Sequence, residues 1–382
     1  MSAVPLRLSE TIPESLASSA MLERVRAIAQ GPLAAIAEAI DREGTYPADV
    51  LQQLGKAGLY RAQTRLDGTP DFVSALKGVV EVSKVCGATG FMVWCQAACT
   101  LYMERSGNPA LGGDTFLRHV HGDTLGGTAL SNPMKAMTGI EPMLLRAERV
   151  ADGYIVNGTL PWVSNLGADH YFGAAATVHE KDGSRRDIMF MVSCRGPGIE
   201  LKTCPSFAGM EGTGTWGVRF TQFKVDASNL IADRVPEFLN EIRPAFILLQ
   251  VGFGLGVAQG AIDSMWAVEG QLGHVNQFLH DRPAELQAEL DALTLRTHQI
   301  ARMLSEGKSP SPLDVLDVRA HASELALRAA QSALLHQGAR GYLLSSSVQR
   351  RVRESHFVAI VTPALKHLRR EMAKQSTQEM PA

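Results

Sequence analysis

Two short segments combine hydroxyl side chains with apolar and aromatic ones, which is the chemistry needed to hold a flat heterocycle. They are Thr128-Ala-Leu-Ser-Asn-Pro133 and Asn157-Gly-Thr-Leu-Pro-Trp-Val-Ser-Asn165. Such groups can cover the face of a ring and donate hydrogen bonds to its edge. Either segment alone is also typical of an ordinary turn rich in Ser and Asn. Together they indicate a binding site for a planar ring.

A glycine-rich stretch in the last third of the chain does not have the spacing of a dinucleotide-binding loop. That fingerprint requires glycine at i, i+2 and i+5, whereas Gly252 and Gly254 are followed by Val257. Gly252, Gly256 and Gly260 instead recur every four residues. This spacing predicts one face of a helix that a neighbouring helix approaches closely.

Other catalytic signatures are missing from the sequence. It contains no HExxH motif, no GxSxG elbow and no phosphate-binding loop of the form GxxxxGK[ST], and its eleven histidines are scattered. The cysteines form no zinc-binding CxxC pair and no even disulfide framework; they are Cys86, Cys95, Cys99, Cys194 and Cys204. We therefore expect no metal site and no simple hydrolytic mechanism, and we interpret the cysteines as buried thiols in a reducing compartment.

The composition predicts a globular protein of more than one domain. The chain has 382 residues, of which 45% are hydrophobic and 20% charged, so it can bury a large core. Its net charge of −2 provides no positive field for nucleic acid or an anionic membrane. The N-terminus is unlike a signal peptide, and we expect no segment apolar over the ~20 residues of a bilayer span. We expect a cytoplasmic protein with neither nucleic acid nor membrane as a partner.

Hydrophobic periodicity predicts helices, then strands, then helices. Residues 68–107 are expected to form two of the first helices, and the second is nearly apolar all round, which predicts a place at the centre of its bundle. Between Gly122 and Asp226, β-branched and aromatic runs indicate a β domain without intervening helices, with a hairpin turn at Asp152-Gly153. The helices expected after this domain cover 236–270, 283–305, 313–337 and 346–375. The predicted domains are 1–122, 123–235 and 236–382.

Several segments, taken in order along nearly the whole chain, resemble motifs of the acyl-CoA dehydrogenase superfamily. Thr128–Pro133 resembles A-x-T-E-P, and Asp152–Gly158 followed by Trp162–Asn165 resembles D-G-Y-x-x-N-G…W-I-T-N. The other matching segments are Ile40–Pro47, Leu54–Leu59, Gly209–Thr215, Leu255–Asp263, Gly338–Tyr342 and Val348–Glu354. The resemblance implies an α+β fold with an N-terminal helical domain, a central β-barrel or sandwich domain and a C-terminal four-helix bundle.

The resemblance also implies a flavin site, with FAD as the cofactor. The residues implied to contact the isoalloxazine ring are Leu130, Ser131, Trp162 and Ser164. The Ser164 hydroxyl would face the reactive nitrogen of the flavin, and Trp162 would lie against the ring. The residues implied to reach the dinucleotide of a neighbouring subunit are Gln277, Phe278, Gly338 and Ala339. These assignments imply a homotetramer built as a dimer of dimers.

The sequence departs from the family pattern at the catalytic base. Counting forward from Arg353-Glu354 places the family's glutamate at Thr362, or at Val361 with a one-residue slip, and neither is a base near neutral pH. The alternative position used by some members falls near Phe246. After Pro133, the sequence Met-Lys-Ala-Met-Thr-Gly replaces the loop of members that bind CoA.

Three functions remain open at this stage. The first is dehydrogenation of an acyl thioester, with His356 or Glu211 as an unusual base and an electron-transfer partner. The second is a two-component monooxygenase that receives reduced flavin, in this case FMN, from a reductase and acts on an aromatic substrate; it needs no such base. The third is a non-catalytic flavoprotein scaffold.

Overall fold

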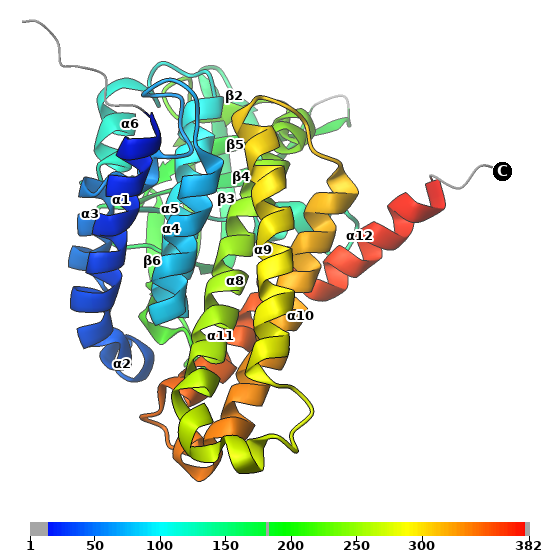
Figure 1. Cartoon of the computed structure of the whole chain (residues 1–382). Helices are drawn as coiled ribbons and strands as arrows, with labels where there is room; N and C mark the ends of the chain where they lie inside the picture. Colours follow the sequence, from blue (N-terminus) through cyan, green and yellow to red (C-terminus); the bar gives the residue numbers. More distant parts are fainter. Residues whose placement is uncertain (1–13, 181–182, 379–382) are drawn as a thin grey trace, which may run out of the picture.

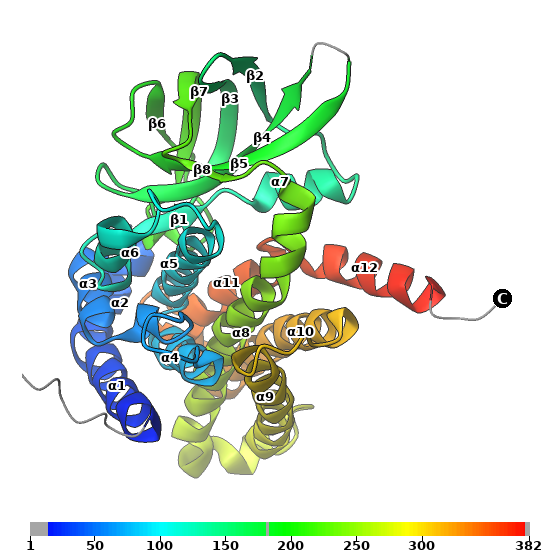
Figure 2. The same ribbon diagram turned by 90° about the horizontal axis from the view of Figure 1, so that it is seen from above.

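The structure is a computed structural model that describes residues 14–180 and 183–378. Helices, strands and helices follow one another along the chain, as predicted. Figure 2 shows the sheet lying along one side of the helices, and Figure 1 shows α8 running away from the sheet to the far end of the molecule.

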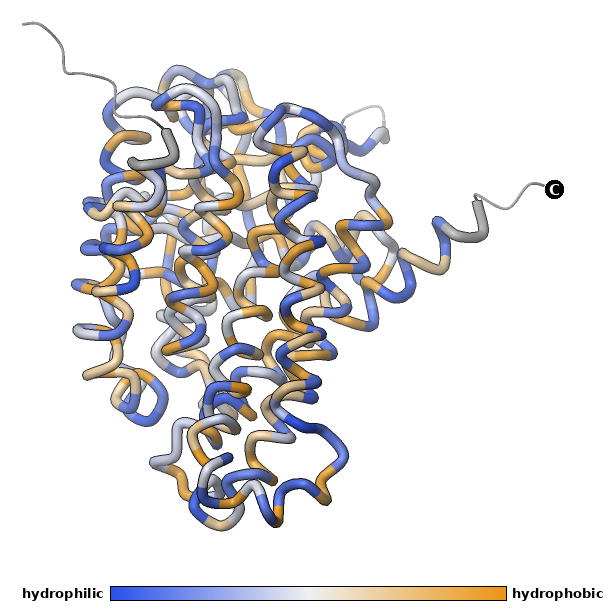
Figure 3. Tube along the Cα trace, viewed as in Figure 1, coloured by the Kyte–Doolittle hydropathy of each residue, from blue (hydrophilic) through white to orange (hydrophobic). Residues whose placement is uncertain are grey.

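The N-terminal helices surround one buried helix. In order they are α1 (Glu14–Ile28), a π-helical turn (Ala29–Leu33), α2 (Ala34–Arg42), α3 (Ala48–Lys56), α4 (Phe72–Val85), α5 (Gly87–Arg105) and α6 (Gly113–Val120). α5 is buried on every side from Gly87 to Met103, which confirms the central place predicted from its apolar sequence. The outer helices bury one face only, and Figure 3 shows hydrophobic and hydrophilic turns alternating along α1.

The central sheet is mixed rather than purely antiparallel. Its strands are β1 (Gly126–Thr128), β2 (Leu145–Val150), β3 (Gly153–Val163), β4 (Tyr171–His179), β5 (Arg185–Ser193), β6 (Ile199–Thr203), β7 (Trp216–Val225) and β8 (Leu230–Ala232). The order is β6-β7-β3-β2-β4-β5-β8, and β1 and β2 both pair with β4 in parallel. The predicted hairpin is confirmed, because Val150 pairs with Gly153, whose φ is 131°.

One prediction for this region was wrong. A short helix, α7 (Ser131–Met137), lies between β1 and β2, where no intervening helix was expected. It connects β1 to β2, and both strands run parallel to β4. β1 pairs with residues 171–173 of β4 and β2 with residues 177–178, so the two strands lie one after the other along β4, and α7 belongs to the connection between them.

The C-terminal helices differ from the prediction at two of their ends. They are α8 (Val235–Asn276), α9 (Pro283–Ser305), α10 (Pro312–Gln337), α11 (Ser347–Ile360) and α12 (Leu365–Gln378). α8 continues through the expected break at 270–273, because a glycine costs an established helix only about 1 kcal/mol. The expected single helix 346–375 is two helices. Pro363 cannot donate to the helical ladder and disfavours helical geometry at the preceding residue, Thr362.

The glycine repeat on α8 has the predicted packing role. A methyl group on Gly256 would lie 2.6 Å from the backbone oxygen of Val80, and one on Gly260 would lie 2.5 Å from that of Lys84. Val80 and Lys84 both belong to α4, so only glycine at these positions of α8 allows the two helices to approach this closely. Contrary to expectation, α8 is long and apolar enough to cross a membrane, but 94% of that apolar window is buried inside the protein.

Candidate functional site

A cavity of about 620 Å³ lies where the sheet meets α5, α8 and α11. The structure brings four of the predicted site residues into its lining: Ser131, Trp162, Ser164 and Thr362. They come from the start of α7, the end of β3 and the connection between α11 and α12.

The other predicted residues lie elsewhere. Leu130 is buried and faces a smaller cavity of about 40 Å³ that shares the Phe246 side chain with the large one. The remaining four line neither cavity and gather where α8 and α10 end; they are Gln277, Phe278, Gly338 and Ala339. Asn276 donates to the backbone oxygen of His336 there, which ties these two helix ends together.

The second polar segment lies directly against β1, at the two glycines that precede the first segment. A methyl group on Gly127 would lie 2.1 Å from the backbone oxygen of Ser164, so no side chain fits between them. Asn165, which is fully buried with a φ of 63°, donates to the backbone oxygen of Gly126 at 2.6 Å. Its side-chain oxygen accepts a hydrogen bond from Tyr46 at 2.6 Å. Asn165 therefore fixes the end of β3 against β1.

A chain of hydroxyl groups supports Ser164. Ser164 Oγ lies 2.7 Å from Thr215 Oγ1, which lies 2.8 Å from Thr213 Oγ1. Because Thr213 donates its proton to the backbone oxygen of Met210, Thr215 must donate to Thr213, and Ser164 to Thr215. Sequence reasoning missed Thr213 and Thr215, although both lie in the matched segment 209–215.

Thr362 is held from two sides. Its hydroxyl is 2.8 Å from Ser131 Oγ, and its backbone oxygen accepts a hydrogen bond from Gln250 at 3.2 Å. Gln250 in turn accepts from Arg319 at 2.7 Å, and Arg319 also donates to the backbone oxygen of Val358. The end of α11 is thus anchored to α8 and α10.

Among the described residues, one carboxylate lines the cavity, and it is already hydrogen-bonded. Glu141 accepts hydrogen bonds from Asn132 at 2.8 Å and from Lys135 at 2.9 Å. Burial opposes ionisation of Glu141, but these two donors outweigh it and lower the pKa of the carboxyl group. A carboxylate of lowered pKa is a poor general base near neutral pH.

The two bases suggested by the sequence have different positions. His356 lines the cavity on an exposed part of α11, and no described residue hydrogen-bonds to its ring. Glu211 does not line the cavity, and its carboxylate accepts from the backbone nitrogen of Phe207. Within 14–180 and 183–378, no three His, Cys, Asp or Glu side chains are grouped so as to hold a metal ion.

Two family models match the chain outside the sheet. The acyl-CoA dehydrogenase N-terminal domain matches residues 17–117, and the acyl-CoA dehydrogenase C-terminal domain matches residues 237–375. Together these matches cover more than half of the sequence. The chain belongs to the acyl-CoA dehydrogenase family, and it is an oxidoreductase.

Individual relatives agree with this assignment over nearly the full length. The cyclohex-1-ene-1-carbonyl-CoA dehydrogenase of Geobacter metallireducens is 25% identical over 356 residues, covering 89% of this chain and 93% of the relative. Butyryl-CoA dehydrogenase from Megasphaera elsdenii has a TM-score of 0.84 at 19% identity, covering 97% and 100% of the two chains. A glutaryl-CoA dehydrogenase from Mycobacterium smegmatis, solved with FADH₂, has a TM-score of 0.77 at 17% identity, covering 97% and 96%.

Members of this family use FAD, and the cavity has the features that its ring requires. The volume of about 620 Å³ falls within the range of small-molecule sites, roughly 300–1,000 Å³. Trp162 is 62% exposed at its rim, which leaves the indole free to cover a flat ligand. Ser164 and Thr215 place hydroxyl groups on the same wall. The residues present therefore fit the isoalloxazine ring.

Proposed function

We propose that the protein binds FAD in the large cavity and desaturates an acyl thioester. The observation that carries this proposal is the convergence of Ser131, Trp162, Ser164 and Thr362, from three separate segments, on one cavity. When bound, FAD supplies a hydride acceptor. The protein's part is to cover the ring with Trp162, to place the Ser164 hydroxyl at its edge and to exclude water behind it.

His356 is our candidate for the group that removes the substrate's α-proton. Among the described residues that line the cavity it is the one imidazole, and no described residue hydrogen-bonds to its ring, so the ring is free to accept a proton. Glu141 and Arg353 also line the cavity, but Lys135 neutralises the first and Asp41 pairs with the second.

We propose a CoA thioester as the substrate and an electron-transferring flavoprotein as the electron acceptor. The relative from Geobacter metallireducens acts, by its name, on cyclohex-1-ene-1-carbonyl-CoA, so cyclic acyl groups belong in any substrate screen. Loss of the flavin absorbance on anaerobic addition of an acyl-CoA would support dehydrogenation. Oxygen consumption that requires an added flavin reductase and an aromatic substrate, without such bleaching, would favour the monooxygenase instead.

We also propose that two subunits share each flavin, in a dimer or a dimer of dimers. Phe246 at the cavity and Asn276 at the end of α8 are separated by 30 residues of helix, or roughly 45 Å. If Gln277 and Phe278 contact FAD, they contact the molecule bound to another chain.

The placement of the ring is tested by shortening the side chains that would touch it. Trp162→Ala and Ser164→Ala should each weaken FAD binding or shift the visible absorbance of the bound flavin, because one removes the ring cover and the other a hydrogen bond. Flavin titration followed by absorbance and fluorescence measures both effects. Unchanged affinity and spectra in both variants would reject this position for the ring.

The base is tested by two opposite substitutions. His356→Gln should lower kcat by roughly 10²- to 10⁴-fold without changing flavin content, because it removes the proton acceptor. Thr362→Glu should create or raise acyl-CoA dehydrogenase activity by restoring a carboxylate at the family position. Full activity in the first variant would exclude His356. No gain in a Thr362→Glu protein that still binds flavin and acyl-CoA would show that residue 362 is misplaced relative to the substrate.

A further inference from the structure

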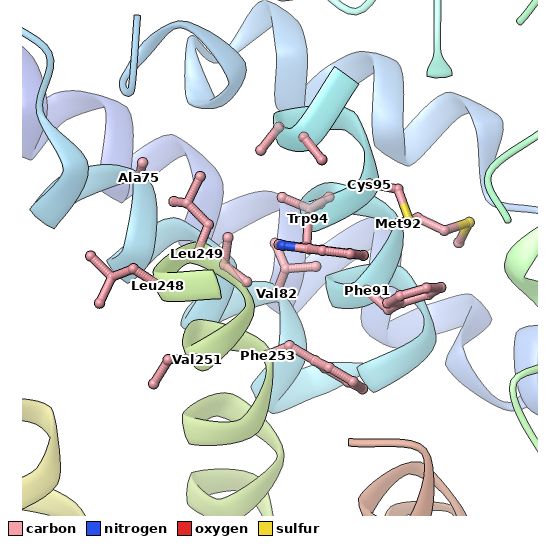
Figure 4. Close-up of a cluster of buried hydrophobic side chains, with 14 of the residues drawn as sticks. Ala75, Val82, Phe91, Met92, Trp94, Cys95, Leu248, Leu249, Val251 and Phe253 are labelled. Atoms are coloured by element: carbon pink, nitrogen blue, oxygen red, sulfur yellow. The ribbon is translucent and has the colours of Figure 1, made fainter. Parts of the chain in front are cut away.

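Four aromatic side chains form one continuous wall of the large cavity. Phe91 and Trp94 extend from α5, Phe246 from α8 and Phe357 from α11. Figure 4 shows Phe91 and Trp94 in the buried cluster between α5 and α8. Trp94 is 2% exposed, whereas Trp162 is 62% exposed. Phe91, Trp94 and Phe246 are each at most 4% exposed, so this part of the wall lies deep in the protein, whereas Phe357 is only partly buried.

The rings in this wall are arranged edge to face as well as stacked. Phe91 and Trp94 stack with centroids 5.5 Å apart and an interplanar angle of 25°. Phe91 meets Phe357 edge to face at 4.8 Å, and Trp94 meets Phe246 in the same way at 4.8 Å. Such a wall presents both π faces and ring edges to a ligand, and a second ring can match either.

Trp94 and Phe246 are held together at the most buried part of the wall. Trp94 Nε1 donates to the backbone oxygen of Phe246 at 2.9 Å, which joins α5 to α8 and fixes the indole. Both side chains are almost fully buried, so neither can swing into solvent to make room. A long linear chain that entered from the mouth would end against these two rings.

We propose that this aromatic wall selects a compact, ring-bearing acyl group over a linear one, with Trp94 and Phe246 as the end stop. The inference rests on the proposed function in one respect, because it takes the ring to be part of the acyl group of a thioester substrate. Phe91 and Phe357 provide the faces against which the ring packs, and Trp94 and Phe246 set the depth of the site.

The first experiment compares two thioesters with seven acyl carbons each. Cyclohexanecarbonyl-CoA and heptanoyl-CoA are titrated anaerobically into the FAD-loaded protein, and the dissociation constants are taken from the change in flavin absorbance. We expect the cyclic thioester to bind at least about 10-fold more tightly. Trp94→Ala should abolish this preference and admit dodecanoyl-CoA, while Trp266→Ala, at an exposed indole that does not line the cavity, should preserve it. Equal affinity for the two thioesters in the wild-type protein would overturn the inference.

A second experiment tests the ring preference of the aromatic wall with ligands that carry no thioester. Cyclohexylmethanol and 1-heptanol, which again have seven carbons each, are titrated into the same holoenzyme by calorimetry. A ring preference that falls in Trp94→Leu and in Phe246→Leu supports the proposal, and these variants keep the wall apolar if the alanine variant does not fold. A ring preference among the alcohols with no response to either thioester would support the wall but reject the acyl-CoA substrate. The same ratio of affinities in the wild type and in both leucine variants would overturn the inference.

Discussion

Arg319 is a fully buried cation, and no carboxylate of residues 14–180 and 183–378 pairs with it. This makes it the most informative residue outside the cavity lining. Its guanidinium donates to Gln250, Ser323 and the backbone oxygen of Val358. Burial lowers the pKa of Arg319 to about 9, so the side chain is charged at neutral pH and the folded state bears the cost. That cost is roughly 5 kcal/mol, since the usual pKa of arginine is 12.5 and each pKa unit corresponds to about 1.4 kcal/mol. The structure gives a reason for a destabilising residue in this place. Arg319 holds Gln250, and Gln250 holds the backbone oxygen of Thr362 at the cavity.

Arg319→Met should therefore change stability little but disturb the site. The substitution removes the cost of burying a charge. It also leaves the oxygen acceptors of Gln250 and Val358 without a donor, which destabilises the folded state by about 1–3 kcal/mol for each acceptor. The gain and the loss nearly cancel. We expect the free energy of unfolding in urea to change by less than about 2 kcal/mol. The absorbance of the bound flavin and its response to acyl-CoA should shift, because Thr362 and Ser131 lose their fixed position. Arg319→Lys, which retains a charged donor, should restore part of the wild-type spectrum.

A loss of more than about 4 kcal/mol in Arg319→Met would contradict this balance, since the arginine would then be a net stabiliser. An unchanged flavin spectrum and an unchanged response to acyl-CoA would show that Thr362 does not depend on Arg319.

At the scale of elements, Glu354 links α11 to the start of α5. Its carboxylate accepts a hydrogen bond from the backbone nitrogen of Gly87 at 2.9 Å and lies 3.4 Å from Arg350. A methyl group on Gly87 would come within 2.8 Å of that carboxyl group, so the contact requires glycine. Burial raises the pKa of Glu354, although Arg350 and Arg351 partly oppose the change. This contact sets the position of α5, which carries Phe91 and Trp94 to the cavity.

Glu354→Ala should destabilise the protein by about 3–5 kcal/mol, because it leaves a buried guanidinium and a helix N-terminus without their partner. Glu354→Gln keeps an oxygen that accepts from Gly87, so its cost should be smaller, about 1–2 kcal/mol. Urea denaturation of the two variants measures the difference. If both variants lost the same free energy of unfolding, the hydrogen bond to Gly87 would make no contribution to stability apart from that of the Glu354 charge.

The elements that sequence could predict are those defined by local periodicity. The apolar character of α5 and the four-residue glycine spacing of α8 each predicted a packing role that the structure confirms. The prediction of a single helix over 346–375 was wrong because it did not take into account that Pro363 interrupts a helix. The wall formed by Trp94 and Phe246 was missed for a different reason: its rings come from distant helices, and no spacing in the sequence links them.

The candidate site was predictable only in part, for the same reason. Ser131, Trp162, Ser164 and Thr362 belong to segments with recognisable patterns, and the structure places all four at one cavity. The contacts that support them are long-range: Asn165 with Gly126, and Arg319 with Gln250. The residue types alone do not indicate such pairs, because a buried Asn or Arg is identified only by the partners that satisfy it.

At the scale of the whole molecule, the end of the bundle farthest from the sheet has an unusual surface. Phe278 is 83% exposed there, at the end of α8, where Gln277 and the turn after α10 also lie. Other large apolar side chains near these helix ends are at least half exposed: Val275, Leu335, Tyr342, Leu343 and Leu344. A group of exposed apolar side chains of this kind indicates an interface with another chain.

Phe278→Glu should therefore dissociate the proposed dimer and lower the flavin content together. A carboxylate placed in an apolar interface would lose its hydration without gaining a partner, which costs several kcal/mol, while in a monomer it would cost almost nothing. Light scattering at several protein concentrations measures the mass, and absorbance measures the ratio of FAD to protein. Leu117→Glu is the matched control, because it adds the same charge at a partly exposed leucine on α6, at the other end of the molecule. If the Phe278→Glu protein kept the wild-type mass and its full flavin content, this surface would be excluded from the interface. If it became a monomer that keeps its flavin, each flavin site would be complete within one chain.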